Sequence, residues 1–241
     1  MQAIIMAAGK GSRLGDLTRG MPKSFAEIRG KKLIEYNIDL LHSFGIHDIV
    51  IVTGYRNDAF EELLKNRDGI RLVYNPFYEM VNVLGSFFVG MENLTDDFIY
   101  MHADTLCAPK ILEKLVELKA DINLPVEFTS CDEEAMKVRR ENGKIVEISK
   151  QIPLQKSEGE FIGIASFKKK VIPELKKHTK KLMEEKDFAS YFEGTIQRII
   201  DYEDFEIALE STDNEFWCEI DFMEDYIRAC ETIPEELSNI T

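Results

Sequence analysis

The chain has 241 residues, 44% of them hydrophobic, and a net charge of −14. This length is enough to bury the core of one large domain, and we expect a single domain over residues 1–241. The negative charge argues against nucleic acid or an anionic membrane as the main partner, because both require a broad positive surface. No apolar run approaches the roughly 18 residues that span a bilayer, and the four cysteines are widely scattered. We therefore expect a cytoplasmic protein with reduced thiols.

Apolar periodicity predicts that strands and helices alternate in the first half of the chain. The strands are expected at residues 2–6, 48–52, 71–74 and 98–101, and the helices at 33–44, 58–65, 84–92 and 110–118. The Ile and Val run at 48–52 is typical of a central parallel strand. Such alternation predicts an α/β fold in which a mainly parallel sheet is covered by helices on both faces.

The pattern changes after about residue 120. Asn142 and Gly143 form a strong hairpin signal, because both positions tolerate a positive φ. Expected strands lie at 136–140 and 144–148 around that turn and at 160–167, 206–210 and 217–220, and expected helices at 171–185, 190–200 and 223–232. No Pro/Gly/Ser-rich linker separates this half from the first, which favours one domain.

A glycine-rich loop follows the first expected strand. Gly9 and Gly11 let backbone N–H groups approach an anion closely, and Arg13 and Lys23 add positive charge. A dinucleotide-binding loop would need a third glycine where Leu14 stands, and the Walker pattern is also absent. The basic residues here could focus a small anionic ligand, or they could form an ordinary solvated face.

The complete string of Gly9, Gly11, Arg13, Pro22 and Lys23 resembles the G-x-G-x-R and P-K signature of the nucleotidyltransferase superfamily. This resemblance implies a three-layer αβα, Rossmann-like fold with a mixed, mainly parallel sheet of the nucleotide-diphospho-sugar transferase type. It also implies a nucleotide-binding half at about 1–120 and an acceptor-binding half at about 121–241. Lys23 and Arg13 would be catalytic, with Lys23 bridging the α-phosphate and the acceptor.

Two aspartates are candidates for binding Mg²⁺. Asp104 follows the expected strand at 98–101, and open α/β sheets bind ligands at such strand ends. By the resemblance it is a catalytic metal ligand, although His102 stands where many family members have the first acid of Asp-x-Asp. Asp221 resembles the acid of the family's closing strand that shares the metal, while Glu219 could be a structural acid or a substitute ligand. Asp104 and Asp221 together would be sufficient for Mg²⁺, although a single Asp after a strand could also be an ordinary helix cap.

Nearly the whole chain resembles bacterial CTP-dependent cytidylyltransferases that act on small phosphorylated or phosphonylated alcohols. The resemblance rests on residues 25–28, 53–55, 160–163 and 217–221 and on Asn82 and Ser86. It implies that CMP is transferred from CTP to an acceptor such as phosphocholine, 2-aminoethylphosphonate or glycerol phosphate, with release of pyrophosphate. A sugar-1-phosphate nucleotidyltransferase that uses another nucleotide and a catalytically silent nucleotide-binding module remain alternatives. The protein would act as a monomer or homodimer.

The same resemblance implies which residues contact the nucleotide. They are Ala7, Ala8, Gly9, Gly11, Ser12, Arg13, Gly54, Asn82, Ser86 and Asp104. Asn82 could equally be a turn residue, and Ser86 could equally be a helix cap.

The acceptor is expected to contact Lys150, Glu160, Gly163, Tyr191 and Trp217. Lys150 could hold the acceptor phosphate or could be an ordinary solvated lysine. Tyr191, Trp217 and the neighbouring Phe192 could form an aromatic cage for a quaternary ammonium group, since ring faces attract desolvated cations. Alternatively, these aromatic side chains belong to the core.

Overall fold

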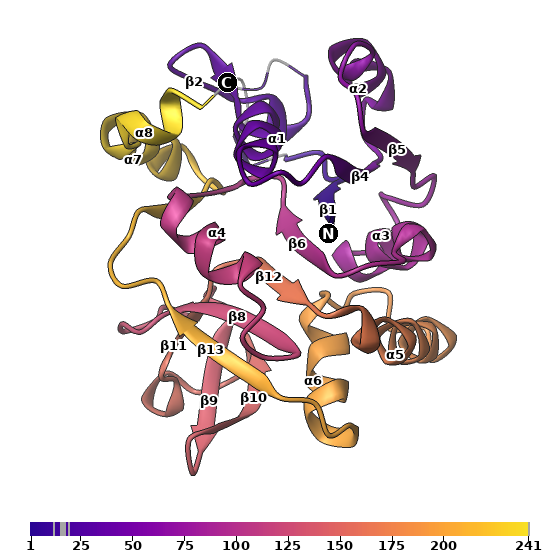
Figure 1. Ribbon diagram of the computed structural model, residues 1–241, viewed down its shortest axis with the longest axis vertical. Helices are drawn as coiled ribbons and strands as arrows, with labels where there is room; N and C mark the ends of the chain where they lie inside the picture. Colours follow the sequence, from indigo (N-terminus) through magenta and orange to yellow (C-terminus); the bar gives the residue numbers. More distant parts are fainter. Residues whose placement is uncertain (12, 15–17, 19, 241) are drawn as a thin grey trace.

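The computed structural model describes residues 1–11, 13–14, 18 and 20–240. A central sheet runs through the molecule with helices on both faces (Figure 1). The first half contains β1 (Gln2–Ala7), β2 (Glu27–Ile28), β3 (Lys31–Lys32), α1 (Leu33–Ser43), β4 (Asp48–Thr53), α2 (Asn57–Leu64), β5 (Ile70–Tyr74), α3 (Val83–Gly90), β6 (Phe98–His102), β7 (Thr105–Cys107) and α4 (Pro109–Val116).

The second half adds further strands to the same sheet and more helices. Its elements are β8 (Ile122–Glu127), β9 (Lys137–Glu141), β10 (Lys144–Ser149), β11 (Gly159–Phe161), β12 (Ile164–Phe167), α5 (Ile172–Glu184), α6 (Glu193–Tyr202), β13 (Ile207–Ser211), β14 (Trp217–Glu219), α7 (Met223–Thr232) and α8 (Glu235–Ser238). None of the helices in the described residues is both long and apolar enough to cross a membrane.

The main sheet has the strand order β10-β9-β11-β8-β12-β6-β1-β4-β5, and β13 pairs with β8 beside this path. Strands β6, β1, β4 and β5 are mutually parallel, as the strand-helix alternation predicts. Strands β8 to β12 pair antiparallel, and β13 runs parallel to β8. The sheet is therefore mixed.

Both faces of the central strands are buried, which explains their nearly continuous apolar sequences. In β1, Ala3, Ile5 and Ala7 face a core that includes residues of α1, α2, α4, α7 and α8. Ile4 and Met6 face the opposite core, against α3, α5 and α6. The expected three-layer α/β fold is thereby confirmed.

Two features of the sheet in the second half differ from the sequence-based expectation, and the short helix α8 is also an additional element. Strand β8 was not expected, because Pro125 cannot donate a ladder hydrogen bond and argues against a central strand. In the structure the carbonyl oxygen of Pro125 still accepts a hydrogen bond from Ile162 N at 3.3 Å. The single strand expected at 160–167 is divided into β11 and β12 by Gly163, whose φ is +77°. A side chain at that position would be strained.

Candidate functional site

The loop after β1 brings Gly11 against Lys23. Gly11 has a φ of +65°, and a Cβ atom at this position would overlap Cβ of Lys23. Gly11 is therefore required twice, for its backbone conformation and for the close approach. Ser12, the remaining expected nucleotide contact of the loop, lies outside the described residues.

Two aspartates far apart in the sequence meet at Lys23. The Nζ atom of Lys23 lies 2.6 Å from Oδ2 of Asp104 and donates a hydrogen bond to Oδ1 of Asp221. Asp104 stands just after β6, and Asp221 just after β14. The antiparallel pairing of β14 with β7 brings these strand ends together, and Ile220 N donates to the Asp104 carbonyl oxygen at 3.1 Å. Arg13 reaches the same place, with Nη1 3.6 Å from Oδ2 of Asp221.

The opposite charges of Lys23 and Asp104 stabilise the ionised form of each group. Burial alone would lower the pKa of Lys23, but the negative charges of Asp104 and Asp221 outweigh burial and raise it. Burial would raise the pKa of Asp104, but the charges of Lys23 and His102 hold it below its ordinary value. The carboxylates of Asp104 and Asp221 thus converge on one positive charge. Mg²⁺ is commonly bound by one or two carboxylates placed in this way.

His102 is the member of the site that the sequence motif did not predict. Its Nε2 atom lies 2.9 Å from the hydroxyl of Tyr100, and its Nδ1 atom lies 3.8 Å from a carboxylate oxygen of Glu219. Burial would lower the pKa of His102, but the hydrogen bond and charge of Glu219 and the charges of Glu193 and Asp104 raise it to about 9. The imidazole of His102 therefore carries a positive charge at neutral pH, at the place where the family resemblance implied an acid.

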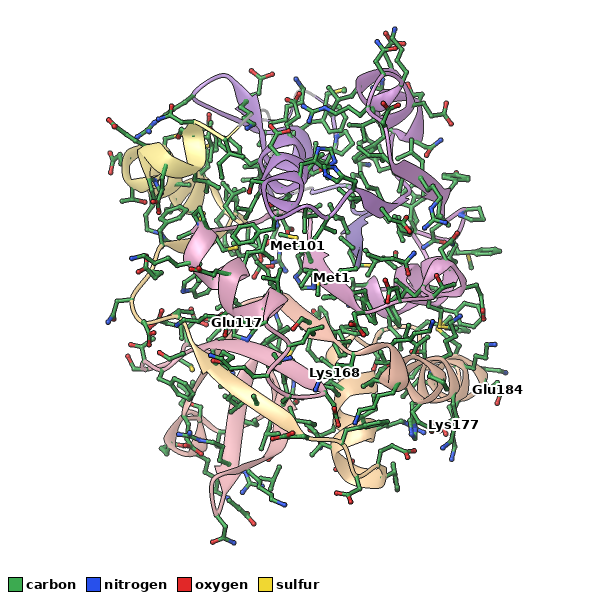
Figure 2. All side chains as sticks on the ribbon, in the orientation of Figure 1. Met1, Met101, Glu117, Lys168, Lys177 and Glu184 are labelled. Atoms are coloured by element: carbon green, nitrogen blue, oxygen red, sulfur yellow. The ribbon has the colours of Figure 1, made fainter. Side chains whose placement is uncertain are left out.

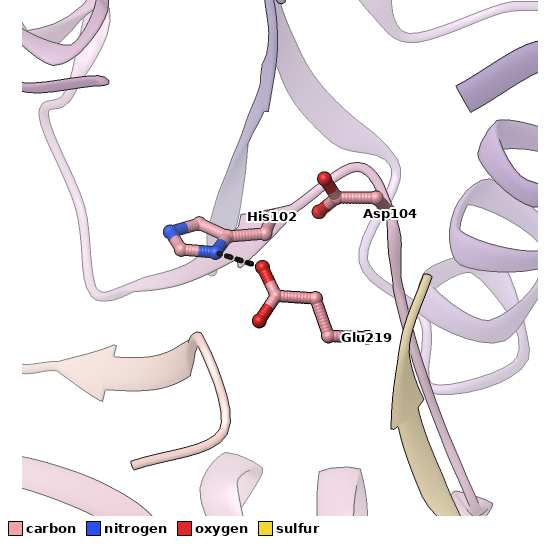
Figure 3. Close-up of side chains that lie close together, drawn as sticks. All are labelled: His102, Asp104 and Glu219. Atoms are coloured by element: carbon pink, nitrogen blue, oxygen red, sulfur yellow. Dashed lines mark ion pairs between the residues drawn. The ribbon is translucent and has the colours of Figure 1, made fainter. Parts of the chain in front are cut away.

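His102, Asp104 and Glu219 point toward a common region (Figure 3). Their ligand atoms all lie within 4.8 Å of one another, so this trio could also hold a metal ion. Nitrogen ligands favour transition metals, whereas the all-carboxylate pair of Asp104 and Asp221 suits Mg²⁺.

A cavity of about 350 Å³ opens beside these groups. Most of the expected nucleotide and acceptor residues line it: Ala8, Gly9, Arg13, Asn82, Ser86, Asp104, Lys150, Glu160, Gly163, Tyr191 and Asp221. A small neighbouring hollow of about 50 Å³ is lined by other members of the loop group, namely Ala7, Gly11 and Lys23. The structure thus gathers residues from both halves of the chain around one space.

Three expected nucleotide contacts also have structural tasks. Asn82 caps α3, since its side-chain oxygen accepts from Val83 N at 2.8 Å, and its amide donates to the Ala189 carbonyl at 3.0 Å. Ser86 lies inside α3 rather than at a cap, and its hydroxyl accepts from the Asn75 amide at 3.1 Å. Gly54 does not line the cavity. A Cβ there would lie 2.7 Å from the carbonyl oxygen of Ala8, so Gly54 permits the close packing of this backbone.

Of the two alternatives for these aromatic side chains, a cage or the core, Phe192 takes the core. This residue is fully buried, and its ring stacks on Tyr100 with ring centroids 4.1 Å apart, so it belongs to the core. Trp217 lines a neighbouring cavity of about 640 Å³ rather than the first one, and its indole N–H donates to Glu127 at 3.2 Å. Of the three cage candidates, Tyr191 is the one that lines the first cavity, and Lys150 Nζ lies 5.2 Å from its ring centroid.

Glu193 is a cavity residue that the sequence analysis missed. It is the first residue of α6, is 2% exposed, and lines the first cavity. A glutamate in the first turn of a helix is common, because the helix dipole favours a negative charge there. The sequence therefore provided no reason to predict that Glu193 belongs to a binding site. Its burial separates it from such ordinary helix-start acids.

A substitution at Gly11 tests the contact between the loop and Lys23. We expect Gly11→Ala to lower the kcat/KM for the nucleotidyl transfer that the sequence resemblance implies by about 10- to 100-fold, because the methyl group would displace Lys23. Gly30→Ala is the matched control, since Gly30 has a φ of +80° but open space around the added carbon. Steady-state kinetics of both variants measure the difference, and equal losses would attribute the effect to backbone strain alone.

Comparisons with known proteins agree with this arrangement. The sequence model of the MobA-like NTP transferase domain matches residues 3–140. The CTP:phosphoglutamine cytidylyltransferase of Campylobacter jejuni is 31% identical over 248 residues, which covers 93% of this chain and 97% of that protein. The choline-phosphate cytidylyltransferase of Streptococcus pneumoniae is 40% identical over 99 residues, covering 41% of this chain and 43% of that protein. The solved inositol-1-phosphate CTP transferase from T. maritima superposes with a TM-score of 0.79 at 27% identity, covering 99% of this chain and 95% of that one.

Proposed function

This chain belongs to the family of MobA-like NTP transferase domains, and from that premise we propose that it transfers CMP from CTP to a small phosphorylated or phosphonylated acceptor. The resemblance to bacterial cytidylyltransferases inferred from the sequence is confirmed by these relatives. The choice of CTP follows the names of the three relatives reported above, and the acceptor class follows the phosphate that their substrates share.

The observation that carries the proposal is the contact of Lys23 with both Asp104 and Asp221 at the edge of the cavity. In the proposed reaction an acceptor phosphate or phosphonate oxygen attacks the α-phosphorus of CTP in line. A new oxygen–phosphorus bond forms, and the bond between the α-phosphorus and the bridging oxygen breaks as pyrophosphate leaves with the electron pair. The attacking oxygen is already anionic at neutral pH, so the reaction needs no general base.

The residues of the chain then act by positioning and by neutralising charge. The backbone at Gly9 and Gly11 would cradle phosphate oxygens, and Arg13 and Lys23 would offset their negative charge. Asp104 and Asp221 would hold Mg²⁺, which supplies further neutralisation of the triphosphate. Lys150, which also lines the cavity, would meet the acceptor phosphate.

A pyrophosphate-release assay with CTP, UTP, dTTP, GTP and ATP tests the proposal against its alternatives. We expect the highest kcat/KM with CTP when the acceptor panel includes phosphocholine, 2-aminoethylphosphonate, glycerol phosphate, inositol phosphate and phosphorylated amino acids. Faster reaction of UTP or dTTP with a sugar 1-phosphate would identify a sugar-nucleotide synthase. Binding of CTP without pyrophosphate release from any pair would identify a silent binding module. We further propose that the enzyme acts in the cytoplasm, as a monomer or homodimer.

A further inference from the structure

We infer that the acceptor carries a protonated amino group with N–H donors, which the carboxylates of Glu160 and Glu193 bind inside the first cavity. This inference rests on the proposed function, because it assigns a chemical class to the acceptor of that reaction. It goes further by separating a protonated amine from a quaternary ammonium group and from an uncharged alcohol.

Glu193 is a buried carboxylate that has no hydrogen-bond partner at one of its oxygens. The residue is 2% exposed, lines the cavity, and its Oε2 atom accepts no hydrogen bond from any described residue. Burial raises its pKa above the ordinary value of a glutamate. A buried polar atom without a partner is costly to the folded chain, so its presence beside a cavity indicates a ligand that donates to it.

Glu160 presents a second carboxylate to the same cavity. It stands in β11 and lines both this cavity and the neighbouring one. Burial and the negative charges of Asp132 and Glu219 raise the pKa of Glu160 to about 7. Neither Glu160 nor Glu193 forms an ion pair within the described part of the chain.

The cations around the cavity already have acidic partners. Lys150 Nζ lies 3.6 Å from a carboxylate oxygen of Glu134, and His102 Nδ1 lies 3.8 Å from Glu219. Arg13 lies against Asp221, on the side of the loop. The charges of His102 and Lys150 act on Glu193, and those of Lys150 and Lys137 act on Glu160, without an ion pair among the described residues. A positively charged ligand could therefore still neutralise both carboxylates.

The kind of ammonium group follows from the side chains that the cavity offers. A quaternary ammonium group is bound mainly by aromatic ring faces. Phe192 is part of the core, and Trp217 lines the neighbouring cavity. Of the aromatic side chains that line the first cavity, Phe161 is buried in the core, Tyr78 packs beside Gly54, and the Tyr191 ring already lies near Lys150. Carboxylates instead form strong, charge-assisted hydrogen bonds with N–H donors, which a quaternary group lacks.

A methylation series of one acceptor tests this inference. We expect kcat/KM with CTP to fall about tenfold or more from phosphoethanolamine to phosphocholine, through the N-methyl and N,N-dimethyl forms, as N–H donors are lost. Ethylene glycol phosphate, which carries an uncharged hydroxyl, should be used as poorly as phosphocholine. The pair of 2-aminoethylphosphonate and 2-hydroxyethylphosphonate should repeat this difference.

The two carboxylates are tested by isosteric substitution. Glu160→Gln and Glu193→Gln should each reduce the preference for phosphoethanolamine over ethylene glycol phosphate to about threefold or less, with the KM for CTP unchanged. Glu184→Gln is the control, because Glu184 is exposed at the end of α5 (Figure 2) and does not line the cavity. That variant should keep the wild-type preference.

The outcomes separate this inference from the proposed function. Equal or better use of phosphocholine or of the uncharged acceptors by the wild-type enzyme would overturn the inference and leave CMP transfer intact. Pyrophosphate release with another nucleotide but not with CTP would overturn the proposed function. If no acceptor in the series is turned over, calorimetric titration of the same acceptors onto the protein with CTP and Mg²⁺ ranks their affinities. Absence of a preference for the protonated amines would then overturn the inference.

Discussion

Replacing Lys23 with methionine should lower the kcat of nucleotidyl transfer by about 10²- to 10³-fold, because the phosphates lose a buried positive charge in the transition state. Methionine keeps most of the length and apolar stem of lysine, so the packing against Gly11 should survive. Pyrophosphate release with saturating CTP and acceptor measures the effect. Lys65→Met is the control, because Lys65 is an exposed lysine that follows α2 and pairs only with Glu62 among the described residues.

A second measurement separates a catalytic role of Lys23 from a purely structural one. In the free protein the ammonium group neutralises Asp104 and Asp221, so its removal leaves two carboxylates facing each other. We therefore expect Mg²⁺ alone to raise the thermal unfolding temperature of Lys23→Met more than that of the wild type. Turnover near the wild-type rate would contradict the assignment of Lys23, whatever happens to stability.

Replacing Asp104 with asparagine should lower kcat by about 10²- to 10³-fold and raise the Mg²⁺ concentration needed for half-maximal activity. The carboxylate is held between Lys23 and His102, whose charges keep its pKa below the ordinary value. An amide at this position would be a weaker ligand for Mg²⁺. A Mg²⁺ titration of the pyrophosphate-release rate measures both changes, and Asp58→Asn on the exposed face of α2 is the control.

Two further variants decide which second ligand shares the metal with Asp104. If Mg²⁺ binds between Asp104 and Asp221, Asp221→Asn should reproduce the loss seen with Asp104→Asn, and Glu219→Gln should have a smaller effect. The reverse order would favour the trio of His102, Asp104 and Glu219. Activity that does not depend on Mg²⁺ at all would contradict both arrangements.

Local patterns in the sequence were sufficient for most of the individual elements. The helix expected at 223–232 is observed as Met223–Thr232, and the four parallel strands of the first half lie within one or two residues of their expected bounds. These elements could be predicted because the period of their apolar residues reports which faces are buried. Strand β8 was missed because its proline contradicts the local rule, and only the neighbouring strands reveal that it is central.

The meeting of Asp104 and Asp221 depends on contacts that no local pattern contains. The family resemblance implied that both acids share one metal, but their approach is made by the pairing of β7 with β14. The pairing of two strands this short cannot be predicted from either sequence, because it depends on two segments that are far apart in the chain.

From the sequence alone one could determine the glycine-rich loop, the types of charged residues available and the alternation that builds the parallel half of the sheet. Tertiary structure decided which residues have partners and which are buried. Lys23 lies between two aspartates, Phe192 is in the core, and Glu193 lines the cavity with a buried oxygen that has no partner among the described residues. The physical reason is that burial and electrostatic pairing depend on distances between segments. Those distances are set only when the whole sheet has formed.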